Sequence, residues 1–117
     1  MATNKDIQHI VSFSRYALGN NANLNWIDTS NVTDMSRLFS YSLFNGDISG
    51  WDVSSVENME SMFYDSVFNG DISKWNVSNV TNMWCMFEYS KFNGDISEWD
   101  VSKVINMSYM FYGSKFN

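Results

Sequence analysis

The chain has 117 residues, of which 44% are hydrophobic and 17% aromatic, and this composition excludes simple disorder and allows one domain with a modest core. A formal net charge of −6 disfavours direct binding to nucleic acid or to anionic membranes, which both require a basic surface. The sole cysteine, Cys85, cannot form an internal disulfide, so stability must come from packing. No apolar run is long enough to span a membrane, and membrane insertion is not expected.

Residues 1–19 are predicted to form an N-terminal capping helix. Thr3 can cap this helix with Asp6 three residues later, and Gly19 suits a left-handed stop. The apolar face comprises Ile7, Ile10, Val11 and Leu18. A repeat array needs such a cap, because its first unit otherwise exposes an apolar edge. Trp26 is expected to pack against the helix, since Gly50, Lys74 and Glu98 occupy the equivalent positions of later units.

A 24-residue repeat fills residues 20–117 in about four copies. The motif FNGDIS begins at Phe44, Phe68 and Phe92, and Phe116 opens another copy at the same interval. Other columns keep this step: Ile27/Trp51/Trp75/Trp99, Val32/Val56/Val80/Val104, Met35/Met59/Met83/Met107 and Phe39/Phe63/Phe87/Phe111. Self-similarity at a fixed period of this size predicts that residues 20–117 form one solenoid.

Two apolar patterns follow one another within each unit. The pattern Ile72-x-x-Trp75-x-Val77-x-x-Val80 predicts a short strand with alternate residues inward. Val80, Met83, Met86 and Phe87 then follow at helical or 3₁₀ spacing. Asn-Gly at 45–46, 69–70 and 93–94 is expected to turn the chain, since both residues tolerate positive φ. The predicted fold class is therefore an α/β repeat solenoid with short parallel strands and helical or 3₁₀ turns.

The order of apolar residues in the predicted strand resembles that of leucine-rich repeats. The whole unit, FNGDISxWDVSxVxNMxxMFxxS, resembles the BspA-like leucine-rich repeats of bacterial surface proteins and lipoproteins over residues 20–117. This resemblance implies a right-handed curved solenoid used for adhesion or protein recognition, on the cell surface or secreted. Two features depart from it: the chain shows no signal peptide, and the array stops at Asn117 without a polar cap. Either the protein is longer, or a partner or a second copy covers the uncapped C-terminal end.

Columns that keep one residue type are expected to be architectural. Trp51, Trp75 and Trp99 are predicted to be stacked core residues. The methionine column at Met59, Met83 and Met107, and the column Leu38/Met62/Met86/Met110, are likewise assigned to the core. Neither arrangement suggests a cofactor, and none is expected.

The acidic turns have two interpretations. Asp47, Asp71 and Asp95 could form a row about 5 Å apart that a divalent cation such as calcium would bridge. Alternatively, each carboxylate caps backbone amides in its own turn. The second interpretation is favoured, because no unit offers several clustered acidic ligands. The neighbouring column Asp28/Asp52/Asn76/Asp100 includes a neutral member, which an amide-capping role permits.

The variable columns carry the candidate binding residues. Within one unit, Trp84, Cys85, Glu88 and Tyr89 are expected together on the outer side of the predicted helical segment. Exposed Trp and Tyr are enriched at binding hot spots. The candidate recognition surface comprises Tyr64, Trp84, Glu88, Tyr89, Tyr109 and Tyr112. The alternative is that these columns vary only because the surface tolerates many residues.

Catalysis finds no support in the sequence. His9 is the sole histidine and falls in the predicted cap helix, and Cys85 has no nearby base. The predicted function is that of a non-catalytic module that binds a protein or a surface ligand, of the adhesin type. Two alternatives are a small acidic inhibitor that mimics nucleic acid and occupies a nucleic-acid-binding protein, and a structural stalk segment of a longer surface protein.

Overall fold

The computed structural model describes all of residues 1–117 and contains one helix, α1 (Ile7–Leu18). Asp6, rather than Thr3, occupies the position before the first helical residue, and its carboxylate accepts the Thr3 backbone N–H at 2.5 Å. The Thr3 carbonyl accepts the Ile7 N–H at 3.0 Å. At the other end, the Gly19 N–H donates to the Arg15 carbonyl at 2.8 Å, and Gly19 has a φ of 92°.

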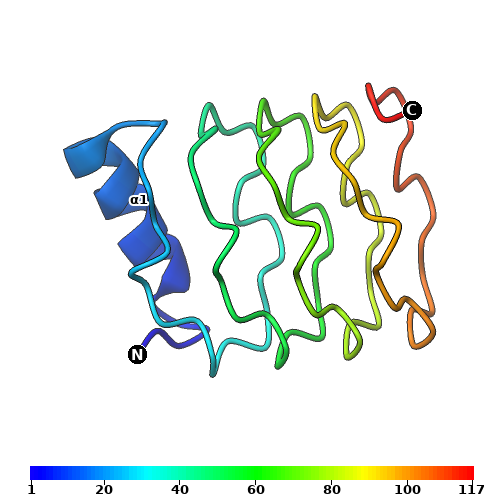
Figure 1. Cartoon of the computed structure of the whole chain (residues 1–117), viewed down its shortest axis with the longest axis horizontal. Helices are drawn as coiled ribbons and strands as arrows, with labels where there is room; N and C mark the ends of the chain where they lie inside the picture. Colours follow the sequence, from blue (N-terminus) through cyan, green and yellow to red (C-terminus); the bar gives the residue numbers. More distant parts are fainter.

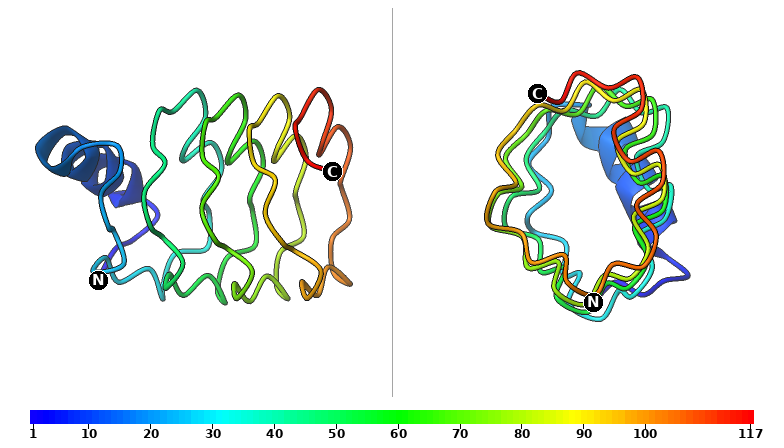
Figure 2. Two further views of the ribbon diagram at one scale, coloured as in Figure 1. Left: turned by 45° about the horizontal axis from the view of Figure 1, so that its top comes forward. Right: turned by 90° about the vertical axis from the view of Figure 1, so that its right-hand side faces the viewer.

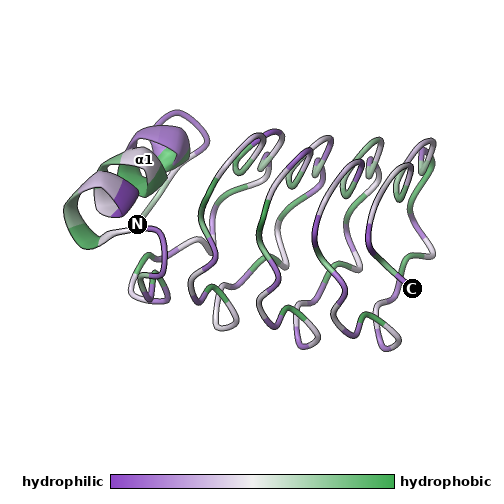
Figure 3. Cartoon of the chain, turned by 90° about the horizontal axis from the view of Figure 1, so that it is seen from above, coloured by the Kyte–Doolittle hydropathy of each residue, from purple (hydrophilic) through white to green (hydrophobic).

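After α1 the chain winds through successive 24-residue units, here called rungs. The rungs comprise residues 20–43, 44–67, 68–91 and 92–115. They lie side by side along the longest axis of the molecule, and α1 covers the N-terminal end (Figure 1). Seen along this axis, successive rungs superpose in one closed outline (Figure 2). The pattern of hydrophobic and hydrophilic segments recurs from rung to rung (Figure 3).

The predicted α/β repeat solenoid of leucine-rich-repeat type is wrong. No rung contains a helix or a strand, and there is no β-sheet. Parallel pairing is limited to isolated bridges: Asn23 with Asp47, Asp34 with Asn58, Asn58 with Asn82, and Asn82 with Asn106. The segment predicted as a strand consists of turns and irregular backbone, and the segment predicted as helical is a run of turns.

The backbone hydrogen bonds explain why turns replace strands. In the first rung the N–H groups of Met35, Arg37, Phe39 and Tyr41 donate to carbonyls 58, 60, 62 and 64 of the next rung at 2.8–2.9 Å. The intervening N–H groups, from Leu38, Ser40 and Ser42, close turns within their own rung at 3.1–3.3 Å. A strand in a parallel sheet would direct its N–H groups alternately to both neighbours. In this row, each N–H that bonds to another rung donates to the rung on its C-terminal side.

Two residues per rung adopt positive φ within this run of turns. They are Arg37, Tyr41, Ser61, Asp65, Cys85, Tyr89 and Tyr109, at 50–60°, and Gly113 at 66°. A non-glycine residue in this region costs about 1–2 kcal/mol. Each of the first six donates its N–H to the next rung at 2.8–3.0 Å, so rung-to-rung bonding holds the conformation in place.

The conserved-looking glycines of the FNGDIS motif serve a different purpose from the one expected. Gly46, Gly70 and Gly94 do not have positive φ. A Cβ at Gly46 would lie 2.0 Å from the Ala22 carbonyl oxygen and 2.7 Å from the Phe44 ring. Glycine is required here because the preceding rung and the ring of the same motif approach the backbone too closely for a side chain.

Aromatic rings form the centre of the core. Phe39, Phe63, Phe87 and Phe111 stack with centroids 5.5–5.6 Å apart and planes within 4° of parallel. A second stack runs beside it, formed by Phe44, Phe68, Phe92 and Phe116 at 6.1–6.4 Å. We call these two rows the Phe stacks. The first stack runs through all four rungs and the second begins in the second rung; both lie in the hydrophobic core.

The tryptophan column is buried, as predicted. The indole N–H groups of Trp51, Trp75 and Trp99 donate to carbonyls of the preceding rung, those of Leu24, Ile48 and Ile72, at 2.9–3.1 Å. The predicted methionine columns are also buried, except that Met107 is 41% exposed because no rung covers it. The expectation for Trp26 is wrong: it is 62% exposed and does not pack against α1.

Candidate functional site

Four tyrosines form a continuous row on the outside of the rungs. Tyr41, Tyr64, Tyr89 and Tyr112 contact one another in sequence, with ring centroids 5.3–6.0 Å apart and interplanar angles of 70–84°. We call this row the Tyr ladder. Tyr109 extends it through an edge contact with Tyr112 at 6.0 Å. Edge-to-face contacts leave ring faces open to solvent and to ligands.

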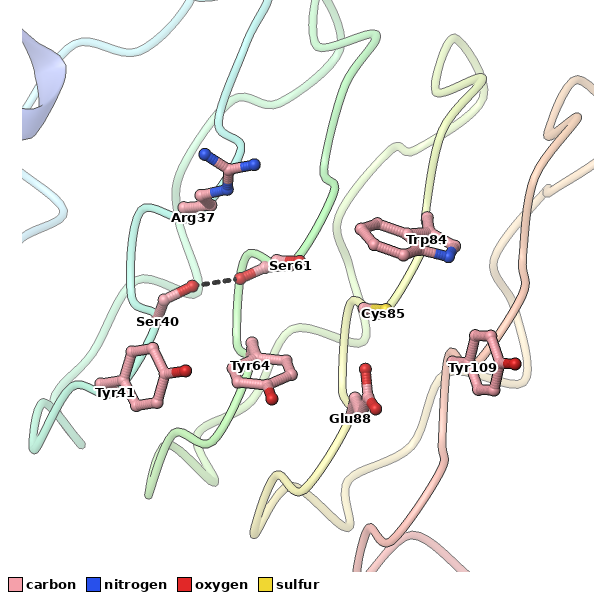
Figure 4. Close-up of a pocket in the computed structure, with 9 residues that line it drawn as sticks. All are labelled: Arg37, Ser40, Tyr41, Ser61, Tyr64, Trp84, Cys85, Glu88 and Tyr109. Atoms are coloured by element: carbon pink, nitrogen blue, oxygen red, sulfur yellow. Dashed lines mark hydrogen bonds between the residues drawn. The ribbon is translucent and has the colours of Figure 1, made fainter.

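A pocket of about 460 Å³ opens beside the Tyr ladder (Figure 4). Residues from all rungs line it: Arg37, Ser40, Tyr41, Ser61, Tyr64, Trp84, Cys85, Glu88 and Tyr109. Ser61 and Cys85 are buried, whereas Trp84, Tyr41 and Tyr109 are exposed. The pocket therefore has a small-residue floor and aromatic walls.

The structure brings four of the six predicted binding residues to this pocket: Tyr64, Trp84, Glu88 and Tyr109. The other two, Tyr89 and Tyr112, belong to the Tyr ladder without lining the pocket. Trp84 is 37% exposed and Tyr89 45% exposed.

Cys85 does not share the outward position expected for it. It is only 4% exposed and lies at the pocket floor, although Arg37 and Tyr109 share its column and its positive φ and are exposed.

Four further residues line the pocket without having been predicted to bind: Tyr41, Arg37, Ser40 and Ser61. Tyr41 had a usable signal, since it shares a column with Tyr89 and starts the Tyr ladder. The two serines carried no signal, because serine occurs throughout the repeat. Ser40 donates its hydroxyl to the Ser61 carbonyl at 2.6 Å and so ties the first two rungs together beneath the pocket.

The pocket lining contains two charged residues, Arg37 and Glu88. Arg37, its one cationic residue, is engaged by Glu60 of the next rung, with Nη2 3.1 Å from Oε2. Glu88 forms no ion pair. Its carboxylate is close enough to raise the pKa values of Tyr64 and Tyr89, although desolvation is the larger cause for both groups.

Cys85 is a protonated thiol at neutral pH. Burial, followed by the neighbouring Glu88 and Glu60 carboxylates, raises its pKa to about 12. Reactive cysteines depend on the thiolate form, which a lowered pKa favours. This environment therefore works against nucleophilic chemistry at Cys85.

The acidic turns hold their carboxylates in local hydrogen bonds. Asp47, Asp71 and Asp95 each accept the backbone N–H of the serine two residues later at 2.8–2.9 Å. Bonds to these serines lower the pKa of all three aspartates. No three His, Cys, Asp or Glu side chains lie close enough together to hold a metal ion.

The C-terminal end of the stack presents a second exposed surface. Ile105 is exposed there, and Phe111 and Phe116 are only partly buried. The N–H groups of Met107, Tyr109, Phe111 and Gly113 have no backbone partner, whereas their equivalents in earlier rungs donate to the next rung. This end combines an apolar face with a row of four free backbone donors.

The chain belongs to the family described as Mycoplasma protein of unknown function, DUF285, which it matches over residues 6–117. No curated protein matches the chain. No solved structure matches it either. The single helix is neither long nor apolar enough to cross a membrane.

Proposed function

We propose that this protein is a non-catalytic binding module that recognises a protein or surface ligand through the Tyr ladder and its adjoining pocket. One observation carries the proposal: rings from variable positions meet in a continuous row, three of them exposed and Tyr64 half-buried, on an otherwise uniform frame. Large, rigid aromatic side chains beside a pocket are characteristic of binding hot spots.

Two further observations support a non-catalytic role. The Cys85 thiol has a pKa of about 12 and is almost fully buried. His9 lies exposed on α1, and the pocket contains no histidine. The pocket thus lacks the nucleophile–base pair that covalent catalysis requires.

The relationship to BspA-like surface proteins is part of this proposal and rests on the repeat sequence alone. The matched family has no assigned function, so the match neither supports nor contradicts a particular activity. On this proposal the module acts at a cell surface, where adhesion through exposed aromatic residues would take place.

The test compares binding of the wild type with that of the double variant Trp84→Ser/Tyr89→Gly on a panel of purified extracellular proteins and glycans. Trp84→Ser reproduces Ser36 and Ser108, and Tyr89→Gly reproduces Gly113 at a position with positive φ. The fold should therefore persist. Loss of about 2 kcal/mol or more of binding free energy is expected for a true ligand.

The matched control is Trp26→Ser/Tyr16→Gly, which removes a tryptophan and a tyrosine that are exposed elsewhere. It should bind as the wild type does. Ligands that bind both variants equally would contradict the proposal. Binding that instead disappears steeply with added salt would favour the acidic nucleic-acid mimic, because carboxylate contacts are screened.

The C-terminal end favours a second candidate function, self-association as part of a structural stalk. Its apolar face and free N–H row motivate this candidate. If two such ends faced each other, backbone N–H donors would meet N–H donors and form no hydrogen bonds. Association would therefore depend on apolar side chains. Sedimentation over a range of concentrations tests it: Ile105→Glu should abolish any dimer, and a wild type that stays monomeric at high concentration excludes it.

A further inference from the structure

Glu88 is the one carboxylate that lines the pocket, and the buried Cys85 thiol is its hydrogen-bond partner there. In Figure 4 its carboxylate lies between Tyr64 and Tyr109, on the same side of the ribbon as Trp84. The structure contains one ion pair, between Arg37 and Glu60, and Glu88 has no cationic partner. A partly desolvated carboxylate among aromatic rings favours a positively charged group nearby.

The aromatic rings around Glu88 favour the same sign of charge. Trp84, Tyr64 and Tyr109 all line the pocket. Aromatic faces carry partial negative charge and attract cations within about 6 Å of the ring centre. The net charge of −6 adds a long-range field that attracts cations.

Two other polar groups of the pocket are already engaged. The Ser40 hydroxyl donates to the Ser61 carbonyl, and Arg37 is held by Glu60 at 3.1 Å. A primary ammonium carries three N–H donors and is strongly hydrated, so contact with aromatic faces costs it hydrogen bonds to water. A quaternary ammonium has no N–H groups and needs only negative charge and aromatic faces.

We propose that this pocket binds a quaternary ammonium group of the choline type, with Trp84, Tyr64 and Tyr109 as its walls and Glu88 as its counter-charge. This inference deepens the proposed binding function and rests on it. The same chemistry is available as free choline or as the headgroup of a choline lipid.

The experiment titrates the protein with choline and with 3,3-dimethyl-1-butanol, the neutral isostere of choline, at constant ionic strength. Chemical shifts of the indole N–H signals, assigned through Trp84→Ser, report binding. Choline should shift the Trp84 signal in a saturable way, and the neutral isostere should bind at least about 10-fold more weakly, since it lacks the charge.

Two carboxylate variants form a matched pair. Glu88→Gln should weaken choline binding about 5-fold or more, because it removes the counter-charge while keeping the side-chain shape. Glu57→Gln changes the net charge equally but lies in a separate polar pocket with Asn79 and Lys103, so it should change the affinity less than twofold.

Equal binding of the isostere, or an unchanged affinity in Glu88→Gln, would overturn the quaternary ammonium assignment while leaving an aromatic binding site in place. Absence of any choline-induced shift would overturn it as well. The protein and glycan panel decides the broader binding function independently.

A flotation assay with phosphatidylcholine vesicles, compared with phosphatidylglycerol vesicles, then separates the two sources of the cation. Co-flotation with the first alone identifies a lipid headgroup, and saturable binding of free choline without flotation identifies a soluble cation. Both results support the inference. Preferential flotation with phosphatidylglycerol would overturn it.

Discussion

The Phe stacks and the Tyr ladder are both rows of aromatic rings that run from rung to rung, yet they are built on opposite principles. Rings within each Phe stack lie within 6° of parallel, and each stack repeats Phe at a fixed 24-residue step. Rings of the Tyr ladder meet at 70–84° and alternate between two variable columns. Inside, each rung presents the same environment to its neighbour, and identical residues satisfy it. Outside, the same backbone accepts Arg, Ser, Cys or Tyr at one column, so the surface can specialise.

The largest effect should come from breaking a Phe stack. Phe63→Ala removes a fully buried ring that contacts Phe39, Phe68 and Phe87 at 4.8–5.6 Å, and it should lower the free energy of unfolding by about 3–5 kcal/mol. Tyr64→Ala, one residue later on the outside, should lower it by about 1 kcal/mol or less. Urea denaturation measures both. If the two variants lost similar free energies of unfolding, the Phe stacks and the Tyr ladder would not differ in their contribution to stability.

The next effect tests the close approach beneath the Phe44 stack. Gly46→Ala places a Cβ 2.0 Å from the Ala22 carbonyl oxygen, so the first two rungs must separate locally, and a loss of about 1–3 kcal/mol is expected. Gly50→Ala is the control, because its Cβ would come no nearer than 3.2 Å to the Asn25 side chain. A larger loss in thermal stability for Gly50→Ala would show that glycine at 46 is not required by packing.

A smaller effect of opposite sign is expected on the outer face. Asp65 is exposed and has a φ of 50°, so Asp65→Gly should raise the free energy of unfolding by about 1 kcal/mol through relief of backbone strain. Asp65→Asn removes the same charge but keeps the side chain, and it separates charge from strain. A gain in both variants would assign the effect to charge instead.

The smallest effect concerns the acidic turns. Asp52→Asn should change the free energy of unfolding by less than about 0.5 kcal/mol at pH 7, because Asn76 already accepts the equivalent N–H at 3.1 Å. Hydrogen bonds from Ser54 lower the pKa of Asp52, so the stabilisation is complete above the unfolded pKa of about 3.9 and disappears as pH falls through the folded value. The melting temperature of the wild type should fall below about pH 4, and less steeply in the variant. If the melting temperatures of the wild type and the variant fell equally with pH, Asp52 would not contribute to the acid sensitivity.

The sequence predicted the inner columns correctly and the rung backbone incorrectly, for one physical reason. Burial makes apolar residues recur at a fixed period, so the Trp and Met columns could be assigned to the core from spacing alone. A run of turns with alternating hand also places Val80, Met83, Met86 and Phe87 inward, and that spacing cannot be told from a short helix. The sequence gives no sign of the positive φ at Arg37 or Cys85, because neither residue type favours this conformation.

The aromatic residues of the candidate site could be predicted from the sequence more readily than the shape of the pocket. Tyr64, Trp84 and Tyr109 stood out as exposed rings in variable columns. The pocket floor could not be foreseen, since the exposed Arg37 and Tyr109 share the column and the positive φ of the buried Cys85. Tyr41 was missed although its column already contained Tyr89.

The two ends of the stack are chemically unlike. The outer row of N–H groups donates only toward the C-terminal neighbour, whereas Glu57 and Val67 donate back to the preceding rung. At the N-terminal end, the Asn4 side-chain oxygen accepts the N–H groups of Thr33 and Asp34 at 2.8 and 3.2 Å. The Thr33 carbonyl accepts the corresponding N–H groups of the following rung. One amide side chain thus imitates a missing rung. Because the outer N–H row repeats its bonds at each junction, whole units can be gained or lost by duplication or deletion of the gene segment without redesigning either neighbour. Each added unit would also lengthen the Tyr ladder's supporting frame, so such a protein can change the reach of its binding face in discrete steps while its fold stays constant.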